Sequence, residues 1–515
     1  MLAYLTDIFG SMRTWCAGGG RQCVRYYVSG VPEALDAPGE FWLDNATMRL
    51  YAVLPESGAA AVDSGGDELL LSTATVPLLN AVGLKHSTFQ GIAFESARAD
   101  GIVCLGCVSV TVRNCSVLAV GTTGVTVRGG SDVAIEGCRV SHCGATGVQL
   151  SGGNHSTLLP AGHVLNNSRV MHTGLVMPAY RPSVQLSGVG LAVTHNLLAH
   201  SPHSAVLLGP AGPFNDVLIS FNEITEVMTD TWDVGAVYFQ GHDFTSQNLT
   251  IDSNLFHGLP LPAASDGAAL CTRSEGGSLS RFGETAFDPQ CGRHAVYADC
   301  CGSAGFSVTS NVLAFPDAPA GCFVVRNNGN RDMVVQNNLV VDAATIGVQT
   351  GSALLNTPAS VLATALAGMR SVRWREPPYS ERYPRLAALD GFIAEPLLGN
   401  CSARPTCPAA PFGNNVTANV LVAPPGSQPP ALAPFALPAL NRSFFAAKGE
   451  FEIAKNMRLA DSAAGWVSPE PRRALDFALR PGSPAFRGGF RPIAVDRIGP
   501  HGMVAKVGGD EPTAA

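Results

Sequence analysis

Acidic and aromatic side chains gather in one stretch of the sequence, residues 221–257. It holds a cluster of acids, Glu223, Glu226, Asp230, Asp233 and Asp243, beside Trp232, Tyr238 and Phe244. Paired carboxyl groups can act as a general acid with a base or nucleophile, particularly where mutual repulsion separates their pKa values. This stretch is therefore the first candidate for a catalytic site.

A repeat must position these side chains, because the stretch lies within a recurring pattern. Short Val-, Ile- and Leu-rich segments alternate with turns, at intervals of 23 to 32 residues between many neighbours. The aligned turn residues are Asn114, Gly137, Asn167, Asn196, Asn222, Asn254, Asn311, Asn338 and Asn419. Each repeat is too small to bury its own apolar face, so the repeats must stack and share one core.

Stacked repeats of this kind predict a right-handed parallel β-helix, an all-β fold like that of pectate lyases. Equivalent strands of consecutive coils would lie side by side, ~4.8 Å apart. Asn suits the turns because it tolerates left-handed backbone and bonds to neighbouring backbone groups. A β-sandwich is the alternative, but it would require close hairpins, whereas these repeats are long and run in one direction.

The pattern divides the chain into a small β unit, a series of coils, an excursion, a last coil and a tail. We expect a small N-terminal β unit in 1–68, coils in 69–345, a partly helical excursion in 346–412, a final coil with a Pro-rich loop in 413–455, and a tail packed on the coils in 456–515. The excursion is expected to be helical near 360–369. Residues 1–20 do not read as a signal peptide, so we expect that the given sequence lacks its true N-terminus.

The composition narrows the possible partners. Hydrophobic residues make up 46% and charged residues 14% of 515 residues, which allows a large core. The net charge of -7 gives no reason to expect nucleic acid as a partner. No apolar run approaches the ~20 residues of a membrane span. The sequence does not indicate an oligomeric state.

Sequons and cysteines favour a secreted glycoprotein, although no signal peptide is visible. The glycosylation sequons are at Asn45, Asn114, Asn154, Asn166, Asn248, Asn400, Asn415 and Asn441. Several of the 14 cysteines are closely spaced, including Cys104 with Cys107 and Cys138 with Cys143. The alternative is a cytosolic protein with free thiols in its core. A second CxxC or His pair at zinc-finger spacing is missing, which disfavours zinc.

Two cysteines are predicted to stack in the core. Cys115 and Cys138 follow equivalent turns of successive coils, so a disulfide and a ladder of reduced thiols are both possible.

The chain also resembles a set of parallel β-helix glycoside hydrolases that includes an α-L-fucosidase and a xylanase. The resemblance rests on an ordered series of segments spanning roughly 24–502, among them APGEFWLDNATMRLYAVLP, DVGAVYFQGHD, HAVYADCCG and DFALRPGSPAFRGGFRPI. It implies the β-helix fold and activity on a carbohydrate.

The resemblance also implies site residues. It assigns the two active-site aspartates to Asp233 in DVGAVY and to Asp299 in HAVYADCC. Asp243 matches a third motif, in which His242 replaces the family's Arg. Cys300 stands where the family has a second acid after the one at Asp299.

The spacing within the repeats supports the same pair. If the segment before Asp299 is an insertion of roughly 30 residues, Asp233 and Asp299 fall at similar positions on adjacent coils. Their ~5 Å separation would suit either a retaining or an inverting glycosidase. Asp243 is the reserve catalytic residue. The predicted substrate-binding residues are His203, Tyr180, Trp232, Tyr238, His242 and Glu223. A hydrolase of this type needs no metal or other cofactor.

Two other functions remain open. A polysaccharide lyase on the same scaffold would use Arg326 or Arg331 as a base, with acidic residues holding Ca²⁺. A β-helix protein that binds carbohydrate without catalysis is the third hypothesis, because one fold can carry several functions.

Overall fold

The structure is a computed structural model in which the chain forms two compact units. It describes residues 30–38, 40–54, 70–231, 234–241, 244–259, 293–299, 304–315, 323–328, 330–342, 345–349, 367–389, 413–426 and 452–501. The first unit comprises Met1–Thr73, Leu270–Gly277 and Gly502–Ala515, and the second comprises Ala74–Ala269 and Ser278–His501.

The first unit contains a β-hairpin. After the short 3₁₀-helix η2 (Pro32–Ala34), strands β1 (Phe41–Asp44) and β2 (Arg49–Ala52) pair antiparallel. The Trp42 and Tyr51 rings lie 5.4 Å apart across the pair, which adds an aromatic cross-strand contact. Both strands lie within the small β unit expected in 1–68.

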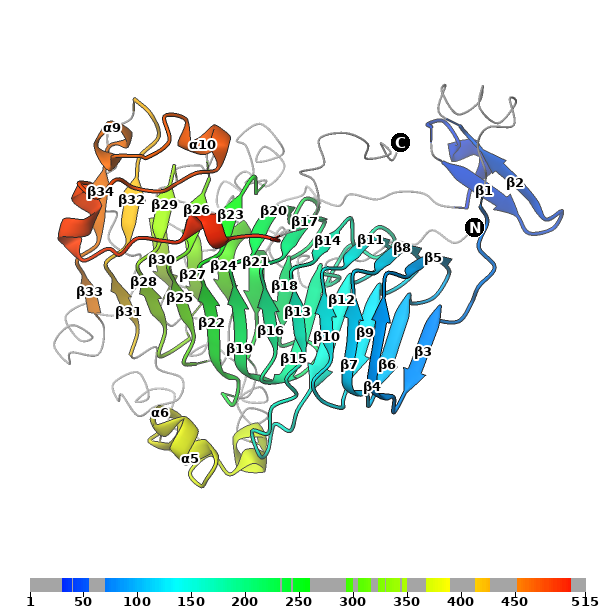
Figure 1. Cartoon of the computed structure of the whole chain (residues 1–515), viewed down its shortest axis with the longest axis horizontal. Coiled ribbons are helices and arrows are strands. Elements are labelled where there is room, and N and C mark those ends of the chain that lie inside the picture. The colour runs from blue at the N-terminus through cyan, green and yellow to red at the C-terminus, as the bar shows by residue number, and fades with distance from the viewer. Residues whose placement is uncertain are drawn as a thin grey trace, which may run out of the picture. The chain divides into compact units, whose positions relative to one another are not determined.

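The second unit is built from three ladders of parallel strands (Figure 1). Ladder 1 consists of β3 (Leu79–Val82), β6 (Ile102–Leu105), β9 (Val125–Arg128), β12 (Val148–Gly152), β15 (Val184–Val189), β18 (Val206–Leu208), β21 (Val234–Phe239), β24 (Arg293–Ala298), β27 (Phe323–Asn328) and β30 (Thr345–Gln349).

Ladder 2 follows ladder 1 in each coil. It consists of β4 (Lys85–Gln90), β7 (Val108–Arg113), β10 (Ala134–Glu136), β13 (Val164–Asn166), β16 (Ala192–Thr194), β19 (Phe214–Ser220), β22 (Gln247–Asp252), β25 (Ser307–Thr309), β28 (Val334–Gln336), β31 (Asn415–Thr417) and β33 (Glu452–Ala454).

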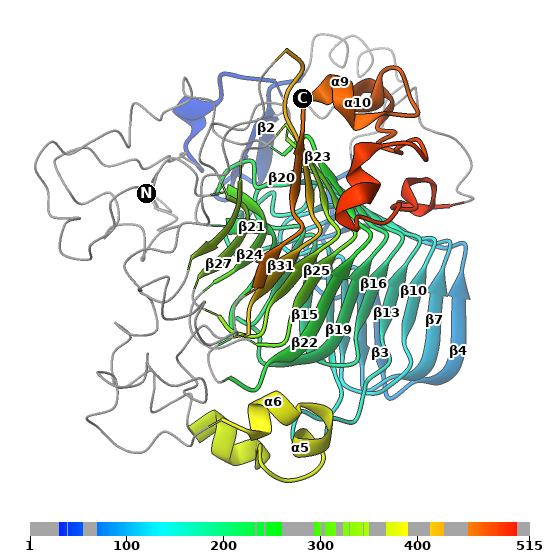
Figure 2. The ribbon, with the colours of Figure 1, turned by 90° about the vertical axis from the view of Figure 1, so that its left-hand side faces the viewer.

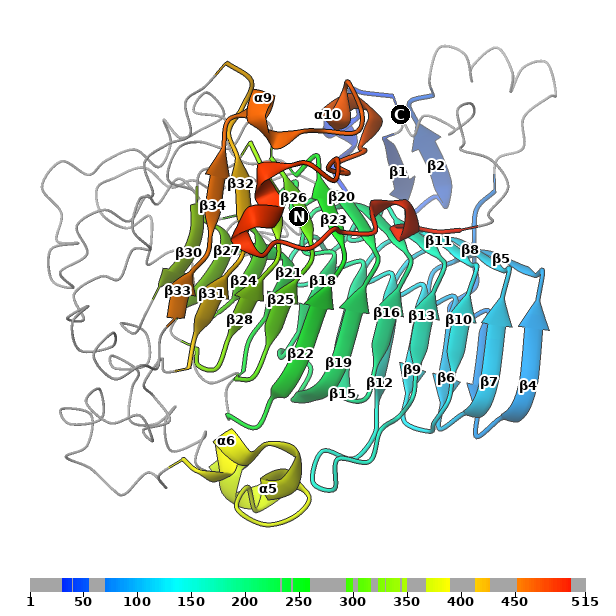
Figure 3. The same ribbon diagram turned by 60° about the vertical axis from the view of Figure 1, so that its left-hand side comes forward.

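Ladder 3 completes each coil and pairs only with itself among the described strands. It consists of β5 (Ala93–Ala97), β8 (Ser116–Val120), β11 (Arg139–Cys143), β14 (Arg169–Met171), β17 (Leu197–Ser201), β20 (Glu223–Val227), β23 (Leu255–His257), β26 (Val312–Ala314), β29 (Leu339–Val341), β32 (Val420–Val422) and β34 (Met457–Leu459). The predicted parallel β-helix is therefore confirmed (Figures 2 and 3).

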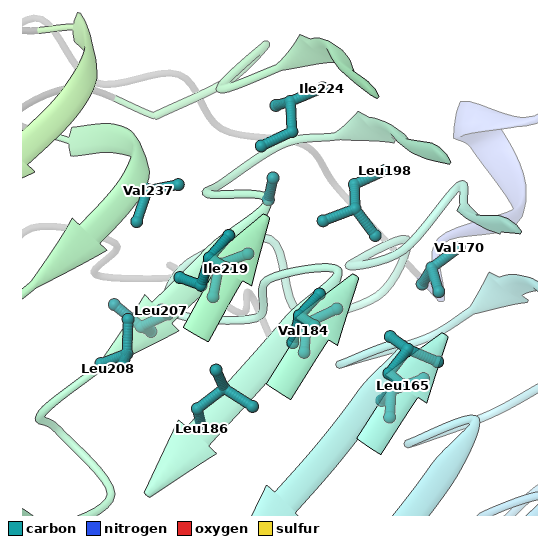
Figure 4. Close-up of a cluster of buried hydrophobic side chains, with 14 of the residues drawn as sticks. Leu165, Val170, Val184, Leu186, Leu198, Leu207, Leu208, Ile219, Ile224 and Val237 are labelled. Atoms are coloured by element: carbon teal, nitrogen blue, oxygen red, sulfur yellow. The ribbon is translucent and has the colours of Figure 1, made fainter. Parts of the chain in front are cut away.

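One continuous apolar core fills the inside of the coils. Alternate side chains of a strand face opposite sides, so Val184 and Leu186 of β15 are fully buried while Gln185 between them is only half-buried. Figure 4 shows how Val184 and Leu186 meet Leu165 of ladder 2 and Leu198 of ladder 3 in the interior. Each coil contributes to the same core, which explains why the repeats need one another.

A buried polar ladder runs along the turn between ladders 2 and 3. Its members are Cys115, Cys138, Ser168, Asn196, Asn222, Asn254, Asn311, Asn338, Asn419 and Asn456. From Asn196 onward each amide Nδ2 donates to the Oδ1 atom of the next asparagine. The prediction that Asn bridges neighbouring turns is correct for these coils.

In the first three aligned repeats the predicted alignment is wrong by one residue. Asn114, Gly137 and Asn167 have φ values of 50°, 61° and 49° and precede the ladder residues. The corresponding left-handed position is His195 before Asn196, with φ 56°. Asn and Gly relieve the steric cost of that position, so composition alone did not distinguish it from the ladder position.

The long excursion contributes two short helices that dock on the coils. Helices α5 (Tyr379–Arg382) and α6 (Pro384–Ala387) follow helical residues 367–372, which overlap the end of the helix predicted near 360–369. The rest of that predicted helix lies outside the described residues. The Tyr379 hydroxyl donates to the backbone oxygen of His155 at 2.7 Å, and Arg382 forms a 2.9 Å ion pair with Asp216.

The coils continue just past the boundary expected at 455: β33 adds a strand to ladder 2 before it, and β34 adds a strand to ladder 3 after it. Beyond them, helices α9 (Asp461–Ala464), α10 (Pro471–Ala474), η4 (Pro484–Gly488) and η5 (Val495–Arg497) follow. An apolar cluster joins Phe477 and Phe490 to outer residues of ladder 3 such as Val341 and Val420.

The final described residues run along the coils. The backbone of Arg491 bonds to the Asn337 side chain, Gly499 N donates to Phe221 O at 2.8 Å, and His501 N donates to Asn167 Oδ1 at 2.6 Å. The tail thus ties turns of coils that are far apart in the sequence.

Candidate functional site

Asp299, one of the residues implied for catalysis, lies beside ladder 1. A row of side chains that alternates along the strands with those facing the inside of the coils, which we call the outer row, comprises Gln185, Leu207, Tyr238, Tyr297 and Arg326. These residues are direct partners in the strand register. The register brings residues from distant parts of the sequence within one strand spacing of each other.

Aromatic and cationic groups stack in the outer row. The Tyr238 and Tyr297 rings are 5.2 Å apart and stacked, and Arg326 Cζ lies 4.7 Å from the centre of the Tyr297 ring. His294 meets the edge of Tyr297 at 5.0 Å and its Nε2 atom is 3.3 Å from Arg326 Nη1. The contacts order four side chains from three coils at one place.

Asp299 lies at the end of β24, next to this row. Its Oδ2 atom accepts hydrogen bonds from the Tyr238 hydroxyl at 2.7 Å and from Gln240 Nε2 at 3.2 Å. Its backbone is held by Phe239 O at 2.9 Å and by Asn330 Nδ2 at 2.8 Å. The partly exposed carboxylate is thus oriented by donors from the preceding coil.

The burial of Tyr238 changes its expected contribution. Its side chain is 2% exposed, and that of Tyr297 is 1% exposed. In this structure Tyr238 therefore presents no open ring face for a sugar, in contrast to the stacking role predicted from the sequence. Its hydroxyl instead positions Asp299.

The rings of His203 and Tyr180 continue the series of aromatic contacts beyond Tyr238, and we call the series Tyr180, His203, Tyr238 and Tyr297 the aromatic row. The His203 ring lies 5.1 Å from Tyr180 and 6.2 Å from Tyr238, and its Nδ1 atom is 3.1 Å from Ser204 Oγ. Burial lowers the pKa of His203 to about 3, so the imidazole is neutral near pH 7. Tyr180 is 41% exposed and has φ 54°, an uncommon conformation for an aromatic residue.

Glu223 does not join this group. It begins β20 on ladder 3, and its Oε1 atom is 2.9 Å from His257 Nε2. The turn at Asn222 separates ladders 2 and 3, so Glu223 leaves the coil on a different face from the outer row. It makes a contact between neighbouring coils, and its substrate role stays a prediction. Glu226, on the same strand, is likewise 2.9 Å from His200 Nδ1.

Four of the predicted site residues, Trp232, Asp233, His242 and Asp243, lie outside the described residues. The pairing of Asp233 with Asp299 therefore stays a prediction. Among the described residues, Phe239 pairs with Ala298, so the residue facing Asp299 on the preceding coil is Gln240.

The sequence held a signal for this register. GAVYFQ at 235–240 and HAVYAD at 294–299 share Ala-Val-Tyr, and aligning them places Gln240 opposite Asp299. The same alignment identifies Tyr297 and His294, which were absent from the predicted site. Counting residues across the intervening segment missed it because the length of an insertion does not reveal where strands pair.

In the part of the chain that the structure describes, no cluster of three or more His, Cys, Asp or Glu side chains could hold a metal ion. None of the described helices is long and apolar enough to cross a membrane. Asn45, Asn114, Asn154 and Asn248 are exposed, Asn166 and Asn415 are half-buried, and Asn400 and Asn441 lie outside the described residues. Glycosylation remains a prediction.

Comparison with known proteins bears on the fold. Residues 79–196 match the family model of the right-handed β-helix region. The protein is a right-handed parallel β-helix. No curated protein matches the sequence of this β-helix.

Three solved structures resemble the β-helix chain. A glycoside hydrolase matches with a TM-score of 0.43 and 15% identity, covering 60% of this chain and 57% of its own. A pectate lyase matches with a TM-score of 0.25 and 16% identity, covering 40% and 56%. A polysaccharide lyase of the PL6 family from Pseudopedobacter saltans matches with a TM-score of 0.34 and 8% identity, covering 81% and 92%. The β-helix chain thus spans 57% of the length of the glycoside hydrolase.

Proposed function

We propose that the protein is a glycoside hydrolase in which Asp299 is one of two catalytic carboxylates. The observation that carries this proposal is the hydrogen bond from the Tyr238 hydroxyl to Asp299 Oδ2, at 2.7 Å. It fixes a partly exposed carboxylate beside aromatic side chains on one face of the β-helix. A fixed carboxyl group can donate a proton to a leaving group when it is protonated, and can activate water or attack the sugar when it is ionised.

The second carboxylate is assigned from the sequence. Glycoside hydrolysis needs a second acid about 5 to 9.5 Å from the first. The register places Gln240 opposite Asp299, and Gly241, His242 and Asp243 follow Gln240 directly in the chain. This favours Asp243 over Asp233 as the partner of Asp299. Retaining and inverting mechanisms both remain compatible with this assignment.

Sugar binding falls to the exposed end of the aromatic row. Tyr180 offers an accessible ring, whereas the rings of Tyr238 and Tyr297 are buried. His203, held neutral by burial, packs between Tyr180 and Tyr238 and links this ring to the group around Asp299. In this proposal Tyr180 stacks on a sugar unit next to the one that is cleaved.

A lyase is the second candidate, and Arg326 is the observation that favours it. The guanidinium lies in the outer row one coil beyond Tyr297, where it could neutralise the carboxylate of a uronic acid. A lyase removes a proton from the sugar ring and leaves a carbon–carbon double bond, whereas a hydrolase adds water and leaves a saturated product.

Product analysis tests the proposal. The full chain is incubated with aryl glycosides, including an α-L-fucoside and a β-xyloside, and with neutral and uronate-containing polysaccharides. We expect new reducing ends that carry oxygen from isotopically labelled water. An unsaturated product that absorbs ultraviolet light would instead establish the lyase. Tight binding on a glycan array without any product would establish a carbohydrate-binding protein.

A further inference from the structure

Two cysteines meet inside the second coil, far from the outer row around Asp299. Cys104 lies in β6, and Cys107 immediately precedes β7. Gly106 between them has φ 63°, and this left-handed residue turns the chain from ladder 1 to ladder 2. Cys104 is 1% exposed and Cys107 is fully buried, so both thiols belong to the core.

The two sulfur atoms are close together. The Sγ atoms of Cys104 and Cys107 are 2.7 Å apart. Non-bonded heavy atoms settle at about 3.5 to 4.0 Å, and bonded sulfur atoms at about 2.05 Å. Two separate thiols must therefore move apart, or the pair must form a covalent bond.

Their surroundings leave little space for separation. The Cys107 Sγ atom is 3.6 Å from Ala81 O of the preceding coil. On the other side, a Cβ atom on Gly130 would lie 1.9 Å from Cys107 O, which shows how closely the next coil approaches. The side chains of Ile102 and Val110 are fully buried in the same core cluster.

A second cysteine pair in the same core provides a contrast. Cys115 and Cys138 are also buried, but each thiol has a carbonyl partner instead of a sulfur. Cys115 Sγ lies 3.3 Å from Arg113 O, and Cys138 Sγ lies 3.4 Å from Glu136 O. The structure thus favours the reduced ladder over a Cys115–Cys138 disulfide.

We infer that Cys104 and Cys107 form a disulfide bond when the chain folds in the presence of a small-molecule disulfide, while Cys115 and Cys138 stay reduced. One thiolate of the pair attacks oxidised glutathione and releases one glutathione thiolate. The second thiolate then attacks the mixed disulfide and releases the other. Two protein thiols are oxidised to one disulfide and one glutathione disulfide is reduced to two thiols, so electrons and protons balance.

The timing of the reaction follows from burial. Thiol–disulfide exchange needs an accessible thiolate, and burial raises the pKa of Cys104 to about 12. The bond must therefore form before the next coils cover the pair. Once the core is closed, reductants in solution cannot reach it. The state of this pair thus records whether the chain folded under oxidising conditions.

Peptide mapping of the full chain tests the inference without depending on any activity. Chain made in a bacterial host is refolded with oxidised and reduced glutathione, denatured, alkylated with iodoacetamide and digested with trypsin. Cleavage after Arg98, Arg113, Arg128 and Arg139 puts Cys104 and Cys107 in one peptide, Cys115 in the next and Cys138 in the third.

We expect the first peptide to be unalkylated and two hydrogen masses lighter than its dithiol form, and the other two peptides to be alkylated. The disulfide should survive a reductant added to the folded protein and disappear when denaturant is added as well. Alkylation of both Cys104 and Cys107 would overturn the inference, and so would a cross-link from either residue to another peptide. In the Cys104→Ser variant, Cys107 should be alkylated; a Cys107 still protected there would also contradict the pairing.

Discussion

The turn between ladders 2 and 3 differs from the outer row of ladder 1 in how far its residue types repeat from coil to coil. In the turn, the same residue recurs: Asn222, Asn254 and Asn311 are fully buried, and successive amides are joined by hydrogen bonds of 2.9 and 3.0 Å. In the outer row the residue type varies along the ladder, from Leu207 through Tyr238 and Tyr297 to Arg326.

This difference separates structural residues from candidate functional ones. Every coil has the same backbone donors to satisfy at the turn, and from Asn196 onward the same side chain satisfies them in each coil. The outer row carries no such shared requirement, and its side chains can differ from coil to coil. Repetition therefore indicates the scaffold, and local departure from it indicates where a specific task is performed.

The largest effect on stability is expected at the turn. Asn254→Ala removes the acceptor for both Asn222 N and Asn222 Nδ2 and the donor to Ile219 O. Leaving these buried groups without partners should lower the free energy of unfolding by about 3 kcal/mol. Urea unfolding measures this loss.

The control is Asn80→Ala, at an exposed position of β3, which should stay within about 0.5 kcal/mol of wild type. An equal fall in the free energy of unfolding in both variants would show that the asparagine ladder contributes no more to stability than an exposed asparagine does.

A pH-dependent effect of intermediate size is expected at His203. Burial lowers the pKa of His203 in the folded protein to about 3 from an ordinary value of 6.5, so between these values the unfolded chain binds a proton that the folded protein does not. Stability should therefore fall as pH falls below 6.5, and this residue should account for about 2 kcal/mol between pH 7 and pH 5.

Unfolding of wild type and His203→Gln at the two pH values measures this contribution, because other titrating groups cancel in the comparison. His203→Gln should lose less stability on acidification, whereas His86→Gln, at an exposed position, should behave as wild type. An unchanged pH dependence in His203→Gln would mean that the imidazole is not buried in its neutral form.

The smallest effect is expected at Tyr180. Replacing its exposed ring by Ala should raise KM about fivefold, equivalent to about 1 kcal/mol of lost stacking, and leave Tm unchanged. Leu175→Ala, 59% exposed, is the matched control and should change neither quantity. A fall in kcat with constant KM would contradict a role in substrate stacking.

The sequence was sufficient for the fold because the repeat appears in residue type as well as in spacing. Asn196 to Asn419 identify the turns directly, since a buried amide is needed at each of them. At Cys115 and Cys138 the same position is occupied by thiols, and the neighbouring Asn114 and Gly137 attracted the alignment instead.

The site was harder to derive. It depends on which residues of β21 and β24 pair, and a long segment separates these strands in the sequence. The shared Ala-Val-Tyr gives that register, but spacing from the turns does not. The hydrogen bond from Tyr238 to Asp299 is a consequence of the register, so no motif within either segment alone predicts it.

The most direct test of the central claim is the rate of Asp299→Asn beside wild type, Asp243→Asn and Asp233→Asn, on whichever substrate the product analysis identifies. Asp252→Asn on the outer side of ladder 2 serves as the control, and Tm verifies folding. If Asp299 and Asp243 are the two catalytic carboxylates, kcat/KM should fall at least ~100-fold in Asp299→Asn and in Asp243→Asn, with Tm unchanged. A folded Asp299→Asn variant with the wild-type rate would contradict it.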